Sequence, residues 1–181
     1  MENLKQLYLE HEQRVTDNLP EIKHVDLWAE QVGFLAEEHP FKTPAVFFAY
    51  RILNANDQGQ RVQQLRMQVD VYIFYETFAD SKRGSKMQNK ALGFLDLLTK
   101  INACFQGGSG NYFSEMRRTG FNPVETGTAA LLYVQRYECS VNDASAQALY
   151  NNMKFENMEV DVVKDQIDTG RVQSSLYDQI N

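Results

Sequence analysis

Between Gln64 and Tyr75 the sequence alternates between polar and apolar residues, and this pattern strongly limits the possible fold. The apolar positions are Leu65, Met67, Val69, Val71, Ile73 and Tyr75, and the polar positions are Gln64, Arg66, Gln68 and Asp70. Successive side chains of a strand point to opposite faces of a sheet. The period of two therefore predicts a strand with one buried face.

The residues just before this strand predict its hairpin partner. Residues 44–53 are apolar on both faces for most of their length, which places this strand inside the sheet. Residues 54–60 contain Asn, Asp and Gly, which tolerate the backbone dihedrals of turns. We therefore expect a long hairpin as the scaffold of the fold.

Two amphipathic helices are predicted on either side of the hairpin. The first covers residues 2–18, and the second runs from Ser85, a potential cap, to Phe105, before the Gly107–Gly110 loop. The apolar stripe expected on the second helix is Met87, Ala91, Phe94, Leu95, Leu98, Ile101 and Phe105. Apolar residues at this spacing should cover one face of the sheet.

Three further strands complete the prediction: a short one near an edge over residues 22–28, a modest one over 113–119, and a strong one over 128–141. A turn-rich connection at 120–127 joins the last two. Clustered strands with interspersed helices and no regular βαβ repetition predict an α+β fold. We expect a mostly antiparallel sheet with two helices packed on it.

The character of the sequence changes after Val141. Residues 1–141 carry 17 acidic and 15 basic side chains, whereas residues 142–181 carry 7 and 3. We expect an α+β domain over 1–142 and an acidic C-terminal extension over 143–181, beginning with a short helix. The extension is either a partly ordered tail or, as we favour, an extended arm that adds to a sheet edge or groove of another subunit. Its candidate interface residues are Phe155, Met158, Val160 and Val162.

The sequence contains no recognisable catalytic, cofactor or metal motif. It lacks the phosphate-loop, dinucleotide, nucleophile-elbow and zinc-protease patterns. The histidines, at positions 11, 24 and 39, are not paired at helical spacing, and Cys104 and Cys139 fit buried structural thiols. We expect no enzyme, no cofactor and no metal, although distant carboxylates could still meet in the fold.

The chain has no apolar run long enough to span a membrane and no export signal at its start, so we expect a protein made in the cytoplasm. The near-neutral body argues against a dedicated duplex-DNA binder. One dense basic cluster contains Lys82, Arg83, Lys86 and Lys90. This cluster is either a solvated helix start or a surface that faces DNA or an acidic partner, such as the tail of a neighbouring copy.

Residues 22–28, followed after a loop by Pro40–Tyr50, resemble the start of small proteins encoded among the tail genes of tailed phages and prophages. In that family a Pro-Phe-x-x-Pro-Ala-Val-Phe segment precedes a long alternating strand, a helix and a final aromatic strand. Tyr133–Cys139 stands where the closing strand belongs. The resemblance covers residues 1–142 and is to tail terminators and related head-to-tail connection, or tail completion, proteins.

The resemblance implies a structural virion protein that acts by assembly. Such proteins form a homo-oligomeric ring, typically a hexamer, that caps the tail tube or joins it to the head. The implied partners are other tail or connector proteins, with DNA only passing through the lumen and no membrane. The implied location is the virion, after synthesis in the host bacterial cytoplasm.

Two other function classes remain open from the sequence. One is a monomeric or dimeric protein-binding module that uses the basic helix start and the acidic tail. The other is an enzyme whose site is assembled from scattered residues and is not visible in the sequence.

Overall fold

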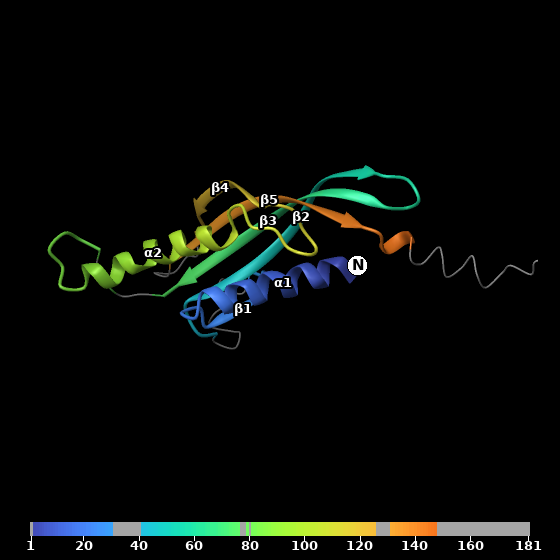
Figure 1. The fold of residues 1–181 in the computed structure, drawn as a ribbon. Coiled ribbons are helices and arrows are strands. Elements are labelled where there is room, and N and C mark those ends of the chain that lie inside the picture. Colours follow the sequence, from blue (N-terminus) through green and yellow to red (C-terminus); the bar gives the residue numbers. More distant parts are fainter. Residues whose placement is uncertain (1, 31–40, 77–78, 80, 126–130, 148–181) are drawn as a thin grey trace, which may run out of the picture. The chain divides into compact units, whose positions relative to one another are not determined.

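A computed structural model describes residues 2–30, 41–76, 79, 81–125 and 131–147. The chain divides into two units, residues 1–149 and 150–181, and the described residues all belong to the first. Its elements are α1 (Glu2–Asn18), β1 (His24–Leu27), β2 (Ala45–Asp57), β3 (Gln63–Tyr75), α2 (Gln88–Phe105), β4 (Arg117–Pro123) and β5 (Leu131–Asp143), as Figure 1 shows.

The strands form one sheet in the order β1-β2-β3-β5-β4. Neighbouring strands are antiparallel except β1 and β2, which run parallel. The predicted α+β fold with a mostly antiparallel sheet is therefore confirmed. The short strand predicted near an edge is indeed the edge strand β1.

The long hairpin is confirmed, but its turn is shorter than the sequence suggested. Residues 54–57, predicted as turn, continue β2 and pair with residues 63–66 of β3. The turn itself closes where Gln58 N donates to Val62 O over 2.8 Å. Gly59 has a left-handed φ of 80°, which glycine adopts without strain. The Asn-rich stretch is thus strand because cross-strand pairing outweighs its local turn preference.

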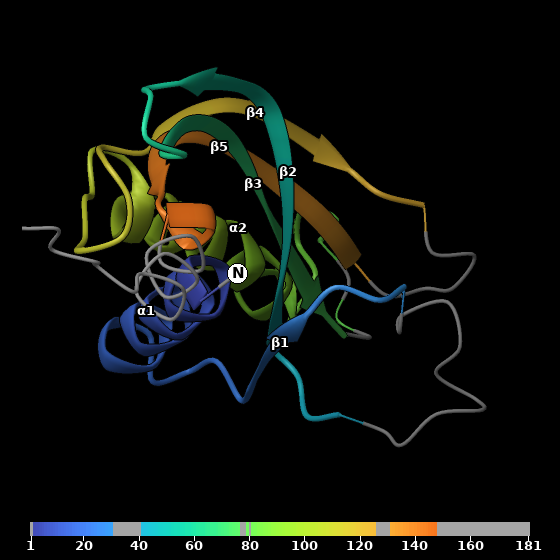
Figure 2. The same ribbon diagram turned by 90° about the vertical axis from the view of Figure 1, so that its right-hand side faces the viewer.

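Both helices pack on the same face of the sheet, which Figure 2 shows from the end. The alternating apolar side chains of β3 point to this face, and Val69, Val71 and Ile73 are fully buried there. One face of β3 is covered by the helices and the other is not. The apolar positions of the alternating sequence are therefore the ones on the covered face.

The second helix differs from its prediction in start and in stripe. It begins at Gln88, because Ser85 lies in a turn where its Oγ accepts a hydrogen bond from Met87 N over 3.2 Å. Met87 and Leu95 are 47% and 52% exposed, and Leu97 is buried instead. The apolar residues exceed what one face of the helix can bury, so spacing alone could not separate Leu95 from Leu97.

The strand predicted over residues 113–119 exists but is displaced, because only residues 117–119 of that range belong to it. Phe113 and Met116 are buried from a loop, and β4 begins only at Arg117 and continues through Pro123, across residues predicted as a turn. Met116 is held by the end of α2, because its O accepts from Gly107 N and its N donates to Gly108 O, each over 2.8 Å. Gly107, with φ 75°, ends the helix as expected.

The final strand is confirmed from Leu131 to Asp143. The first three residues of its predicted range, 128–130, lie outside the described part. A helical turn at residues 145–147 follows it, and the rest of the short helix predicted there also lies outside the described part.

The core contains a buried histidine. His11 of α1 is fully buried, and its ring lies 4.7 Å from the Phe113 ring and 5.5 Å from the Phe48 ring, centroid to centroid. Its Nδ1 lies 3.1 Å from the Tyr50 hydroxyl, and its Nε2 has no hydrogen-bond partner. Burial, with a smaller contribution from Arg14, lowers the pKa of His11 to about 3. His11 is thus a neutral core residue.

His11 should make the stability of the fold depend on pH. In the unfolded chain the imidazole protonates below its ordinary pKa of 6.5, whereas in the folded chain it stays neutral down to about pH 3. As the pH decreases from 6.5 toward 3, the free energy of unfolding should fall by about 1.4 kcal/mol per pH unit from this group alone. His11→Phe should remove that slope. Denaturant unfolding of both proteins from pH 7 to pH 4 measures the difference, and parallel pH profiles would contradict it.

Candidate functional site

The sheet face opposite α1 and α2, which we call the open face, has an apolar half and a polar half. The apolar half lies beside β1, where Phe47 and Phe74 are buried in a second cluster. Trp28 lies partly buried in this cluster and stacks on Tyr72 with ring centroids 4.2 Å apart. Trp28 therefore contributes to this second cluster.

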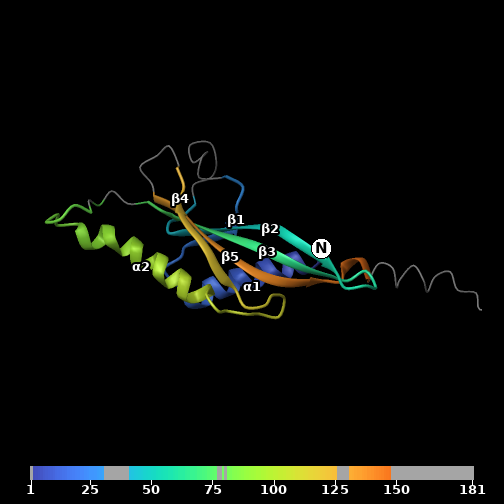
Figure 3. The same cartoon turned by 90° about the horizontal axis from the view of Figure 1, so that it is seen from above.

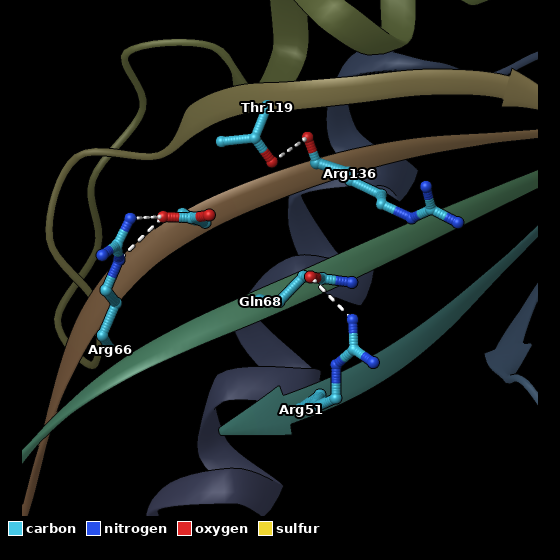
Figure 4. Close-up of polar contacts among 6 residues, drawn as sticks. Arg51, Arg66, Gln68, Thr119 and Arg136 are labelled. Carbon is cyan, nitrogen blue, oxygen red and sulfur yellow. Dashed lines mark hydrogen bonds and ion pairs between the residues drawn. The ribbon is translucent and has the colours of Figure 1, made fainter. Parts of the chain in front are cut away.

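The polar half lies toward the β2–β3 turn and carries a network of charged and amide side chains. The strand register sets Arg51 opposite Gln68 and Asp70 opposite Arg136, so these groups share one face. Arg51 Nη2 donates to Gln68 Oε1 over 2.9 Å, and Gln68 Nε2 donates to Asp70 Oδ1 over 2.7 Å. Figure 4 shows the Arg51–Gln68 contact.

A second pair lies further toward the turn. Arg66 Nε donates to Glu138 Oε2 over 2.8 Å across β3 and β5, as Figure 4 shows. The Arg66 side chain is 64% exposed, and that of Arg136, which lies 3.7 Å from Asp70, is 41% exposed. Both guanidinium groups thus remain accessible to a partner.

The polar half of the open face has a positive balance, unlike the chain as a whole. The register brings together four arginines, Arg51, Arg66, Arg117 and Arg136, and two carboxylates, Asp70 and Glu138. Glu115 lies at the same half, so four positive and three negative groups give a net charge of +1 here, whereas the whole chain carries −6. The polar half is thus suited to contact an acidic segment.

A broad hollow of about 490 Å³ lies on this half of the face. It is lined by Asn54, Asn56, Gln64, Arg66, Glu115, Arg117 and Glu138, among others. Amide and guanidinium groups in an open depression can bind a chain through hydrogen bonds and charge. Small-molecule sites, by contrast, are mostly apolar and enclose their ligand.

The two edges of the sheet form the other candidate surface. β1 pairs with β2 only from Ala45 to Phe48, so the same edge of β2 has no paired strand from residue 50 to residue 57 among the described residues. Ile52 and Leu53 are 50% and 40% exposed there, next to a bulge. At the opposite edge β4 exposes 46% of Phe121. Large apolar groups thus face solvent on both sides of the sheet.

The basic cluster predicted as an interface is exposed as expected, although only Lys90 belongs to α2. Lys82, Arg83 and Lys86 lie in the turns before the helix, and all four side chains are exposed. Figure 3 shows that the start of α2 and the β2–β3 turn lie at opposite ends of the sheet. The structure therefore does not bring this cluster together with the open-face arginines. The other predicted interface residues, Phe155, Met158, Val160 and Val162, lie outside the described residues.

Both cysteines are free thiols, Cys139 buried and Cys104 partly buried. Burial raises the pKa of Cys104, and it raises the pKa of Cys139 to about 11. A protonated thiol is a poor nucleophile and a poor metal ligand. Cys104 instead contacts the carbonyl of Arg14 through Sγ at 3.7 Å. The thiols thus fit the structural role expected from the sequence.

Histidine and acidic side chains do not converge on a metal site in the part of the chain that the structure describes. Within those residues no group of three or more His, Cys, Asp or Glu side chains could hold an ion. Neither described helix is long and apolar enough to cross a bilayer. His39, the third histidine considered from the sequence, lies outside the described residues.

Sequence reasoning placed Arg66, Gln68 and Asp70 on the polar face of β3 but did not single them out as a surface. The missing information was the register, since only the pairing of β3 with β2 and β5 adds Arg51, Arg136 and Glu138 to them. A basic cluster spread over three strands leaves no local run of charge in the sequence.

Comparison with known proteins adds no identification: no protein-family model matches the chain, and a search of curated proteins found no match.

The Arg66–Glu138 pair should contribute little to folding, because Arg66 is mostly exposed. A double-mutant cycle with Arg66→Ala and Glu138→Ala should give a coupling energy below about 1 kcal/mol that falls further with added salt. Urea unfolding of the four proteins measures it. A coupling above about 2 kcal/mol would mean that the pair stabilises the fold and is not held available for a partner.

Proposed function

We propose that this chain is a structural virion protein that assembles into a ring, which caps the phage tail tube or joins the tail to the head, and that it acts without catalysis. The proposal is supported by the resemblance of residues 1–142 to tail terminators and connection proteins. The observation that carries it is the exposure of large apolar side chains at both edges of the sheet, Ile52 and Leu53 on one side and Phe121 on the other.

Two different surfaces on opposite sides of one subunit favour a head-to-tail contact. In such a contact the edge of β2 in one copy faces the β4 edge of the next, so each added copy leaves one free edge of each kind. Repeated contacts close into a ring when the rotation between copies permits it. The copy number of six comes from the family resemblance alone.

The surrounding partners follow from the same proposal. They are further copies of this chain and other tail or head-to-tail connector proteins, with DNA only passing through the lumen. The protein is made in the host bacterial cytoplasm and ends in the virion. A channel through which DNA slides should not bind it tightly, and the near-neutral charge of residues 1–141, 17 acidic against 15 basic, is compatible with that requirement.

A second candidate is a monomeric or dimeric module that binds an acidic partner through the basic cluster. The observation that favours it is the exposure of all four side chains, Lys82, Arg83, Lys86 and Lys90. Binding through such a cluster should weaken steeply with added salt. Self-association through apolar edges should depend on salt much less.

Two single variants test the head-to-tail contact. Phe121→Glu should spoil the β4 edge and Ile52→Glu the β2 edge, so that each protein alone stays monomeric. Mixed together they should form a heterodimer, because each retains the edge that the other lacks. Leu95→Glu, at an equally exposed position on α2, is the matched control and should assemble like the wild type.

Analytical ultracentrifugation of the separate and mixed variants measures the assembly, and negative-stain microscopy of the wild type with isolated phage tail tubes tests the tail role. The proposal expects rings, alone or at tube ends. A wild type that remains monomeric and leaves the tubes bare would overturn it. Variants that fail to complement each other would rule out a head-to-tail contact.

A further inference from the structure

We propose that residues 155–162 of one copy add as a strand to the free edge of β2, residues 50–57, in the next copy, so that this strand lies between the β2 edge and the β4 edge that faces it. This inference deepens the proposed function, because it names the contact between copies, and it rests on the self-association that the function requires.

The β2 edge is a backbone surface ready to pair. Trp28 N donates to Phe48 O over 2.9 Å, which shows that Phe48 directs its backbone groups toward the β1 side. Alternate residues of a strand direct their groups to the same side, so Tyr50 and Ile52 present theirs along the edge that β1 no longer covers. An added strand would bond to these groups.

This edge lacks most of the features that prevent strands from adding. Exposed edges are usually blocked by lysine, by proline, by a bulge or by a very short strand. Here the edge is eight residues long, contains no Lys and no Pro, and exposes half of Ile52. A bulge beside Ile52 is the one irregularity. Extended segments bind to such edges through backbone bonds, with alternate side chains giving specificity.

Residues 155–162 have a sequence that suits this edge. Met158, Val160 and Val162 alternate with Asn157, Glu159 and Asp161, and the segment contains no Gly and no Pro. As a strand, residues 157–162 would have one apolar and one acidic face, whereas Phe155 and Glu156 before them reverse this pattern. The edge of β2 is matched to both, because Ile52 lies opposite Met67 on the helix-covered face and Arg51 lies on the open face.

Charge also favours the orientation in which the acidic face of the segment lies on the open face, beside Arg51. Residues 142–181 carry 7 acidic and 3 basic side chains, a net of −4, whereas the polar half of the open face has a net charge of +1. With the valines beside Ile52, the carboxylates of Glu159 and Asp161 would lie beside Arg51. Opposite charges across neighbouring strands stabilise the pair and fix which face is which.

The chain leaves the body close to the β2–β3 turn. Asp143 is paired with Gln63, the first residue after that turn, and Gln147 Nε2 lies 3.5 Å from Gln60 Oε1. The seven residues 148–154 can extend over at most about 25 Å. A copy whose β2 edge lies within this distance of Gln147 could receive the segment. Docking on the edge of its own chain is the alternative that the experiment must separate.

Cysteine pairs in the full-length protein test the proposal. One protein carries Arg51→Cys, and a second, distinguishable by a mass tag, carries one added cysteine at position 157, 159 or 161. Mild oxidation of the mixture should give disulfide-linked heterodimers. Matched proteins with Met158→Cys or Val160→Cys place the thiol on the other face and should cross-link at least about tenfold less, because a disulfide needs β-carbons about 4 Å apart.

A hydrogen-exchange measurement checks the same contact without substitutions. Amides of Tyr50 and Ile52 should exchange at least about tenfold more slowly at concentrations where the wild type self-associates than where it does not. Amides of residues 82–87, in the turns before α2, provide the comparison within the same protein.

The outcomes separate this inference from the proposed function. Heterodimers confined to positions 157, 159 and 161 support the arm exchange. Absence of cross-links, with no protection of Tyr50 and Ile52, in a protein that still assembles would overturn the inference and leave the ring intact. A third protein carries both Arg51→Cys and Glu159→Cys. If cross-links form only within one chain of this protein, the segment docks on its own β2 edge, and the inference of a contact between copies is overturned. A protein that never assembles would overturn the ring proposal as well.

Discussion

The pairing of β3 between β2 and β5 is the constraint on which the rest of the structure depends. All three strands are 13 residues long, and the register between them decides which side chains are covered by α1 and α2 and which remain on the open face. A shift of one residue would exchange the two sets and bury Arg66 and Asp70 in place of Met67 and Val71. The helix-covered core and the polar open face are therefore two consequences of one register.

The same register explains how far the sequence could predict the fold. The hairpin, the first helix and β5 were predictable because their apolar residues repeat with the period of the element that buries them. The strand start placed at Phe113 was wrong because Phe113 and Met116 are apolar for another reason: they fix a loop to the end of α2. Local pattern cannot distinguish a buried loop anchor from a strand residue.

The candidate surfaces were less predictable, since they depend on neighbours that are distant in sequence. Arg51 and Arg136 are 85 positions apart, yet strand pairing places both on the open face (136 − 51 = 85). The free edge of β2 depends on the shortness of β1, which pairs with four residues of a much longer strand. Both surfaces suit contact with other chains, and in our account the contact is with further copies of the same one.

Self-association of the intact protein is the central claim, and its mass in solution tests it most directly. Light scattering on the full-length chain across a range of concentrations should give a defined multiple of the 20.9 kDa monomer, approached as concentration rises. A mass of 20.9 kDa at every concentration, unchanged when isolated tail tubes are added, would contradict the account.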